Sequence, residues 1–150
     1  MVDLHKIYED LFIDLKKYIE EKSEYDSDLV NKLPNKIDAS LKFPLISCEK
    51  GTFSYDSNLK EQNGFYDYNL MIINIFTKAL NFSCYSSSPI RIYRELEKTI
   101  KNFFEKDDRI DIYVASNSKY INDDIFRNVI FVNYKLNEKT KKTNATTNSN

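Results

Sequence analysis

The stretch FYDYNLMIINIFTK, residues 65–78, constrains the fold more than any other part of this chain. Its first half alternates between apolar and polar residues, which indicates a β-strand with one solvated face. The apolar positions of that first parity are Tyr66, Tyr68, Leu70 and Ile72. From Met71 onward the other parity becomes apolar as well, through Ile73 and Ile75. A strand of this kind needs cover on both faces, so the fold must provide two covers.

Two amphipathic helices are predicted to cover one face of this strand. Apolar residues recur at three- and four-residue steps over residues 3–22, with Asp3 as a plausible N-cap. A second helix begins with Ser88 as its cap and Pro89 at its first position, where the fixed φ of proline favours helix. Its expected buried stripe consists of Tyr93, Leu96, Ile100, Phe103 and Phe104.

Three further strands are predicted around the segment 65–78. Residues 44–56 form a strand that Pro44 opens and that Gly51 bends or seats in a bulge. This strand and 65–78 are expected to pair antiparallel through a turn at Asn63-Gly64. Two more strands follow the second helix, in RIDIYVAS and in IFRNVIFVNYKL. The last is apolar on both parities, which is typical of a central strand.

The resulting order, α-β-β-α-β-β, predicts an α+β fold. We expect an antiparallel sheet of about four strands with both helices packed on one face. Residues 1–136 form a single domain, in which a linker over 23–43 joins the first helix to a core over 44–136. The residues around 28–32 are interpreted as a short helical turn. The tail over 137–150 has no large apolar residue and is expected to be disordered.

Two helices on one face leave the other face of the sheet without cover from this chain. We therefore predict a subunit interface there, formed by Met71, Ile73 and Ile75 together with Tyr113 of the neighbouring strand. The aromatic residues of the first hairpin belong to the core or to this interface. They alternate with Ser, Asp and Asn rather than with Lys or Arg, which argues against base stacking. These residues are Phe53, Tyr55, Phe65, Tyr66 and Tyr68.

Composition argues against a polyanionic or membrane partner. The 22 basic and 23 acidic residues of the 150 nearly cancel, giving a net charge of −1, so no global field favours nucleic acid or an anionic membrane. No apolar run reaches the roughly 18–20 residues of a membrane span. The start, MVDLHKIYED, lacks a signal-peptide pattern, so synthesis in the cytoplasm is expected. Cys48 and Cys84 are then two reduced thiols, with one disulfide as the alternative.

The residue patterns do not predict an enzyme, a metal site or a cofactor. His5, the one histidine, lies at a solvated helix end, a poor place for a catalytic base. Two isolated glycines exclude a phosphate loop. Carboxylates and amides cluster in two turns, one with Asp107, Asp108 and Asp111 and one with Asn122, Asp123 and Asp124. The first cluster supports an alternative, a small metal-dependent enzyme, and a host binding module that uses the sheet face is another.

The segment from Phe43 to Leu136 resembles the tail terminator, or tail completion, proteins of long-tailed bacteriophages. The similarity lies in an N-terminal amphipathic helix and then in four stretches. These stretches are FPLISCEKG, INIFTK, SPIRIYRELEKTIKNFF and DDIFRNVIFVNYKL, the last with an Arg early in the strand. They are patterns of residue type rather than signature residues. The long linker before Pro44 departs from the pattern, and the C-terminal tail has no counterpart in it.

The resemblance implies a structural virion protein without catalytic residues. Such a protein forms a homo-oligomer, a hexameric ring, that caps the tail tube, ends tube growth and offers a docking surface for the head. Its partners would be the tail-tube protein and a head-tail connector or neck protein, with no membrane and no specific nucleic acid. Its place would be the head-proximal end of the virion tail. A head-side neck protein is the alternative within the same class.

Overall fold

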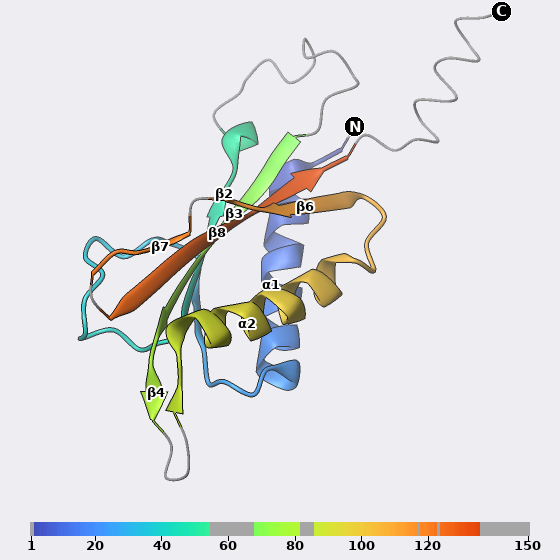
Figure 1. Ribbon diagram of the computed structural model, residues 1–150. Coiled ribbons are helices and arrows are strands. Elements are labelled where there is room, and N and C mark those ends of the chain that lie inside the picture. Colours follow the sequence, from blue (N-terminus) through green and yellow to red (C-terminus); the bar gives the residue numbers. More distant parts are fainter. Residues whose placement is uncertain (1, 55–67, 82–85, 117, 123, 136–150) are drawn as a thin grey trace, which may run out of the picture.

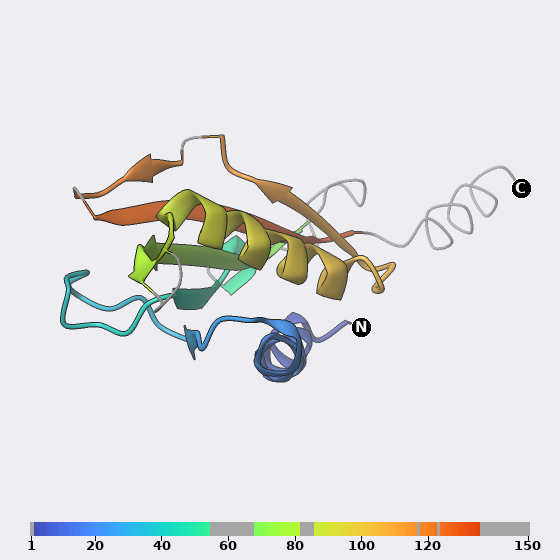
Figure 2. The ribbon, with the colours of Figure 1, turned by 60° about the horizontal axis from the view of Figure 1, so that its bottom comes forward.

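The structure is a computed structural model that describes residues 2–54, 68–81, 86–116, 118–122 and 124–135. Within these residues, the two long helices lie on one side of a mostly antiparallel sheet (Figure 1 and Figure 2). Helix α1 spans Leu4–Lys22 and helix α2 spans Pro89–Phe104. The predicted α+β class, with both helices on one face, is confirmed.

The main sheet has six strands in the order β1-β2-β3-β8-β6, and β7 also pairs with β8. Their bounds are β1 Asp28–Val30, β2 Leu45–Lys50, β3 Tyr68–Lys78, β6 Ile110–Val114, β7 Lys119–Tyr120 and β8 Ile125–Tyr134. A short 3-10 helix, η1 Thr52–Ser54, follows β2, and β4 Leu80–Asn81 pairs with β5 Ser86–Ser87 in a separate two-stranded sheet. The four predicted strands are β2, β3, β6 and β8, but the strand predicted over 44–56 ends at Lys50, and Thr52–Ser54 is helical instead. The additional strands have two or three residues each, too few to show a periodic pattern.

The linker contains a strand where the sequence allowed a helical turn. Residues 28–32 do not form a helix: Asp28–Val30 is β1, which pairs parallel with Leu45–Ser47 of β2. Leu29 is buried in the main core. The backbone hydrogen bonds available from β2 and the burial of Leu29 together outweigh the weak local preference for a helical turn.

Both helices begin where the sequence predicted. Asp3 accepts a hydrogen bond from the amide of Lys6 at 3.2 Å, and Ser88 accepts one from the amide of Arg91 at 3.3 Å. The buried stripes are Leu4, Tyr8, Leu11, Leu15 and Ile19 in α1, and Ile92, Tyr93, Leu96, Ile100 and Phe104 in α2. Phe103 lies beside its stripe, partly buried, with its ring centroid 5.4 Å from that of Tyr18.

A β-bulge on β3 sets which residues of this strand face the helices. Asn69 pairs with Asn133 and Met71 pairs with Val132, so Leu70 is an extra residue between them. The amide of Gly51, directly after β2, donates to the carbonyl of Leu70 at 2.9 Å. A Cβ atom on Gly51 would lie 2.0 Å from the carbonyl oxygen of Asn69, so this close approach of two backbones requires glycine.

Several sequence expectations lie outside the described residues. They are the turn at Asn63-Gly64, the aromatic residues Tyr55, Phe65 and Tyr66, Cys84, Asp123 and the tail 137–150. The antiparallel pairing that the turn was expected to make is present, because Leu45 to Lys50 pair with Phe76 to Met71.

Candidate functional site

Three of the four residues predicted to form a subunit interface are core residues. Met71, Ile73 and Ile75 each have 0% exposed surface within the single chain. They belong to the main core with the apolar residues of both helices. Their expected place on an uncovered face is therefore wrong, because side chains that the chain itself encloses are not available to a partner.

The two faces of β3 are exchanged relative to the prediction. The helices cover the parity of Met71, Ile73 and Ile75, and leave the parity of Ile72 and Asn74 on the other side. The sequence carried a signal for this, since Met71, Ile73 and Ile75 are uniformly apolar whereas Asn74 interrupts the apolar residues of the other parity. The face opposite the helices is called the second face below. It carries Ile72, Asn74 and Phe76 on β3 and Arg127, Val129 and Phe131 on β8.

The linker covers one end of the second face. Leu45, Phe76 and Ile125 form a small separate core there, each at most 2% exposed. Partly buried residues packed against it come mainly from the linker: Val30, Leu33, Ile37, Leu41, Phe43 and Ile121. Figure 1 shows the second half of the linker, in cyan, on the side of the sheet away from the helices. Leu33, Ile37 and Leu41 recur every four residues, but this segment is not helical, so the spacing by itself does not predict their burial.

Polar side chains occupy the centre of the second face. Ser47 and Asn74 lie in direct register on β2 and β3 and are 0% and 2% exposed. Arg127, partly buried, donates to Oδ1 of Asn74 from Nε at 3.3 Å and from Nη2 at 2.7 Å. Its guanidinium carbon lies 5.6 Å from the ring centroid of Phe76, a cation–π contact. Sequence reasoning identified none of these three as site residues.

An apolar row crosses the second face beyond this polar centre. Ile72, Phe131 and Tyr113 lie in direct register on β3, β8 and β6. Ile72 and Phe131 are partly exposed, and Tyr113 is 54% exposed. The rings of Tyr113 and Phe131 stack with centroids 5.0 Å apart and an interplanar angle of 22°. Tyr113 thus lies on the accessible face as expected, and its role in an interface stays a prediction.

The acidic turn at Asp107 is organised by an internal ion pair. Both oxygens of Asp107 accept hydrogen bonds from the Arg109 side chain, at 2.9 and 2.7 Å. These bonds hold the pKa of Asp107 below its ordinary value and raise that of Arg109. No group of three or more His, Cys, Asp or Glu side chains among the described residues is arranged to hold a metal ion.

His5 and Cys48, the other side chains considered for reactivity, pack against neighbouring residues. Nδ1 of His5 lies 3.1 Å from Nζ of Lys50, and the His5 ring packs at 4.9 Å from that of Phe53. Cys48 is free and fully buried, and this burial raises the pKa of its thiol. A thiol held in its protonated form is a poor nucleophile.

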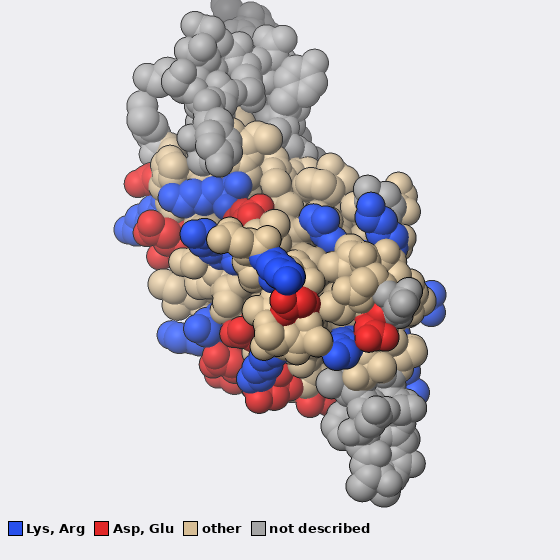
Figure 3. Space-filling model, turned by 90° about the vertical axis from the view of Figure 1, so that its left-hand side faces the viewer, with Lys and Arg blue, Asp and Glu red and all other residues tan. Residues whose placement is uncertain are grey.

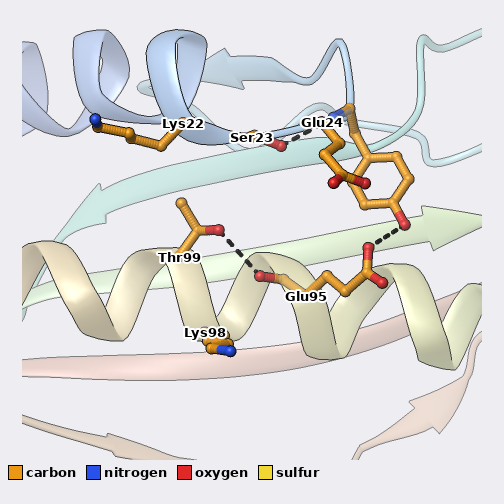
Figure 4. Close-up of a pocket in the computed structure, with 7 residues that line it drawn as sticks. Lys22, Ser23, Glu24, Glu95, Lys98 and Thr99 are labelled. Atoms are coloured by element: carbon orange, nitrogen blue, oxygen red, sulfur yellow. Dashed lines mark hydrogen bonds between the residues drawn. The ribbon is translucent and has the colours of Figure 1, made fainter.

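A shallow polar pocket of about 180 Å³ lies between the end of α1 and the middle of α2 (Figure 4). The hydroxyl of Tyr25 donates to the Glu95 carboxylate, and the Thr99 hydroxyl donates to the Glu95 carbonyl at 3.1 Å. Arg91 also lies 3.6 Å from that carboxylate. Tyr25 and Arg91 thus engage the Glu95 carboxylate, and these contacts connect α2 to the start of the linker.

A comparison with models of known protein families gives no match, and a comparison with curated proteins gives none either. Among the described residues, no helix is both long enough and apolar enough to cross a membrane. The site must therefore be interpreted from its own geometry. That geometry is a sheet face with a linker-covered end, a polar centre and a half-exposed apolar row.

Proposed function

We propose that this chain is a structural virion protein of the tail terminator type. In this proposal it forms a ring, hexameric as in the family it resembles, that caps the tail tube, ends tube growth and provides the surface on which the head docks. It acts as an assembly part and not as an enzyme. Its partners are further copies of itself, the tail-tube protein and a neck protein of the head.

One observation carries the proposal beyond the resemblance: the half-exposed row of Ile72, Phe131 and Tyr113. Apolar side chains that a chain leaves accessible in a contiguous row are typical of a protein interaction surface. The row ends on β6, which is the last strand on its side of the main sheet among the described residues. The order of the principal elements, a helix, two strands, a helix and two strands, supports the resemblance as well.

A pull-down from cells that produce the particles tests the proposal directly. A tagged copy should recover the tail-tube protein, and immunogold labelling should place the tag at the head-proximal end of isolated tails. Recovery of portal or other head proteins alone would assign the chain to the head side of the neck. Recovery of neither class would refute a role in the particle.

The metal-dependent enzyme has less support, because Asp107 is already engaged by Arg109. Its test is inexpensive. Added Mg²⁺ or Mn²⁺ should leave the melting temperature of the wild type and of Asp107→Asn/Asp108→Asn equally unaffected. Stabilisation by metal that the double variant lacks would favour the enzyme.

A further inference from the structure

Arg127 is a partly buried cation for which the described chain offers no carboxylate. The ion pairs of the described residues do not include it, and its hydrogen bonds go to the neutral amide oxygen of Asn74. One edge of the guanidinium is thus anchored, while its carbon lies over the Phe76 ring in the cation–π contact. A guanidinium fixed in this way is suited to accept a carboxylate without further ordering.

A second cation lies directly across from it. Lys119 of β7 is in register with Arg127 of β8, and Lys119 is exposed and also outside the ion pairs of the described residues. Like charges at directly opposed positions of adjacent strands repel each other. An anion bound between them would replace this repulsion with two attractions.

The residues beside Arg127 are polar, and one of their side chains lacks a hydrogen-bond partner among the described residues. Ser47 is 0% exposed, and its hydroxyl has no hydrogen-bond partner among the described residues. It lies in register with Asn74, the residue that anchors Arg127. Buried polar groups without a partner are uncommon, and each calls for an explanation such as a bound water or ion.

We propose that Arg127, held by Asn74 and assisted by Lys119, binds a carboxylate of the protein that docks on the apolar row. The row of Ile72, Phe131 and Tyr113 lies four residues along β8 from Arg127 on the same face. A partner surface that carries both apolar side chains and one carboxylate would match the apolar row and Arg127. Figure 3 shows the side of the molecule that is on the left in Figure 1, where charges of both signs are interspersed with uncharged areas.

A protein carboxylate fits this face better than a polyanion. Glu49 and Asp111 lie on the same face, in register with Ile72 and Asn133 respectively. Their negative charges would repel a nucleic-acid backbone that extended from Arg127 along the row. A single carboxylate at the Arg127 end does not meet them.

Three small molecules test which head group the site binds, because each carries one phenyl group and they differ in the head group. They are 3-phenylpropionate, 3-phenylpropanol and phenyl phosphate. NMR titration of the isotope-labelled chain should show saturable shifts of the Arg127 Nε–H and Asn74 side-chain signals with 3-phenylpropionate. Arg127→Gln should weaken this binding about tenfold or more, as expected for the loss of a charge-assisted hydrogen bond. Arg94→Gln, which removes an exposed charge from α2, is the matched control and should bind as the wild type does.

Each other outcome overturns the proposal. Equal binding of the alcohol would mean that the face recognises only apolar groups, and tighter binding of phenyl phosphate would identify a phosphate site. Absence of saturable shifts would mean that no carboxylate site exists.

Arg127→Lys keeps the charge without the planar fork, so it should bind with intermediate affinity. A variant that loses the native spectrum is replaced by Lys119→Gln, for which a smaller loss is expected.

This inference names a recognition element of the same surface on which the proposed function rests, yet the two can fail separately. If tagged wild-type chain recovers the tail-tube protein but the probes give no saturable shifts at Arg127, the carboxylate site is wrong and the terminator role stands. If the probes bind at Arg127 but no particle protein is recovered, the terminator role is wrong and the carboxylate site stands.

Discussion

The two faces of β3 are built from alternate residues of one strand, and they differ in how they are covered. Met71, Ile73 and Ile75 are fully enclosed beneath the helices. On the other side, Phe76 is enclosed by the linker, Asn74 is buried among polar neighbours and Ile72 stays partly exposed. The comparison shows that an apolar pattern on both parities does not make both faces equivalent.

The physical reason is the cost of enclosing a polar group without a partner. Buried apolar surface contributes roughly 25 cal/mol per Å², so two helices stabilise most when they cover the uniformly apolar parity. A slip of one residue would take Asn74 away from Arg127 and place it under the helices, where its amide would need new hydrogen bonds in a mainly apolar core. On the second face Asn74 instead meets Arg127.

The largest effect is expected for Ile73 on the helix side. Ile73→Ala should lower the free energy of unfolding by about 2–5 kcal/mol, because it leaves a cavity in a fully buried site. Ile73→Asp with Ile75→Asp should abolish folding. Urea denaturation followed by circular dichroism measures both, with the partly exposed Ile72→Ala as the milder control. A folded double variant that only fails to assemble would restore the interface role of these residues.

Gly51 tests whether the bulge sets the faces. Gly51→Ala places a Cβ against the backbone of Asn69, so we expect a loss of about 1–3 kcal/mol as the strands move apart. Chemical denaturation gives the value, and amide hydrogen exchange shows where it acts. Faster exchange should be confined to the β2–β3 end near Leu70. A neutral effect would mean that the two backbones approach less closely than described.

The linker side should be less sensitive than the helix side. Leu41 is partly buried against the small core under the linker, so Leu41→Ala should cost about 1 kcal/mol. Comparison with Ile73→Ala in the same denaturation series quantifies how unequal the two covers are. Equal losses would show that the linker is as much a part of the core as the helices.

The acidic turn lies outside both faces and predicts a dependence on pH. The folded-state pKa of Asp107 is lowered first by its hydrogen bond with Arg109, so the ionised form is favoured by folding. This contribution is fully present above the ordinary carboxyl pKa of about 4 and is lost as the pH falls through the lowered folded value. At pH 7 Asp107→Asn should cost about 0.5–1 kcal/mol after solvent screening. The difference from wild type should vanish near pH 2; a constant difference would assign it to packing.

Tyr113 should have the smallest effect on stability and the clearest effect on association. Tyr113→Ser removes an exposed ring stacked on Phe131, so the change in unfolding free energy should stay within about 0.5 kcal/mol. In the proposed ring, the variant should assemble less well in sedimentation-velocity runs at equal concentration. Tyr120→Ser, which removes another exposed tyrosine, is the control. Identical assembly of both variants and the wild type would remove Tyr113 from the interface.

Much of the architecture could be predicted because it depends on local patterns. Both helix starts follow from a capping residue whose side chain reaches the backbone amide three residues on, an interaction that depends on neighbouring residues only. The alternation in β6 likewise predicts that Tyr113 points away from the core and Ile110 towards it. Most of the candidate site could not be predicted in this way. Its centre joins Ser47, Asn74 and Arg127, which are brought together only when β2, β3 and β8 pair in their actual register.

The sequence by itself determined the class of the fold, the two helices and the four principal strands, because hydrophobic period and caps are properties of short segments. The tertiary structure decided which parity of β3 the helices enclose, that the linker covers part of the opposite face, and where Arg127 lies. These outcomes depend on strand register and on a one-residue bulge at Leu70. A register is a choice among whole-chain arrangements, and it is selected by the total burial and hydrogen bonding that each arrangement achieves.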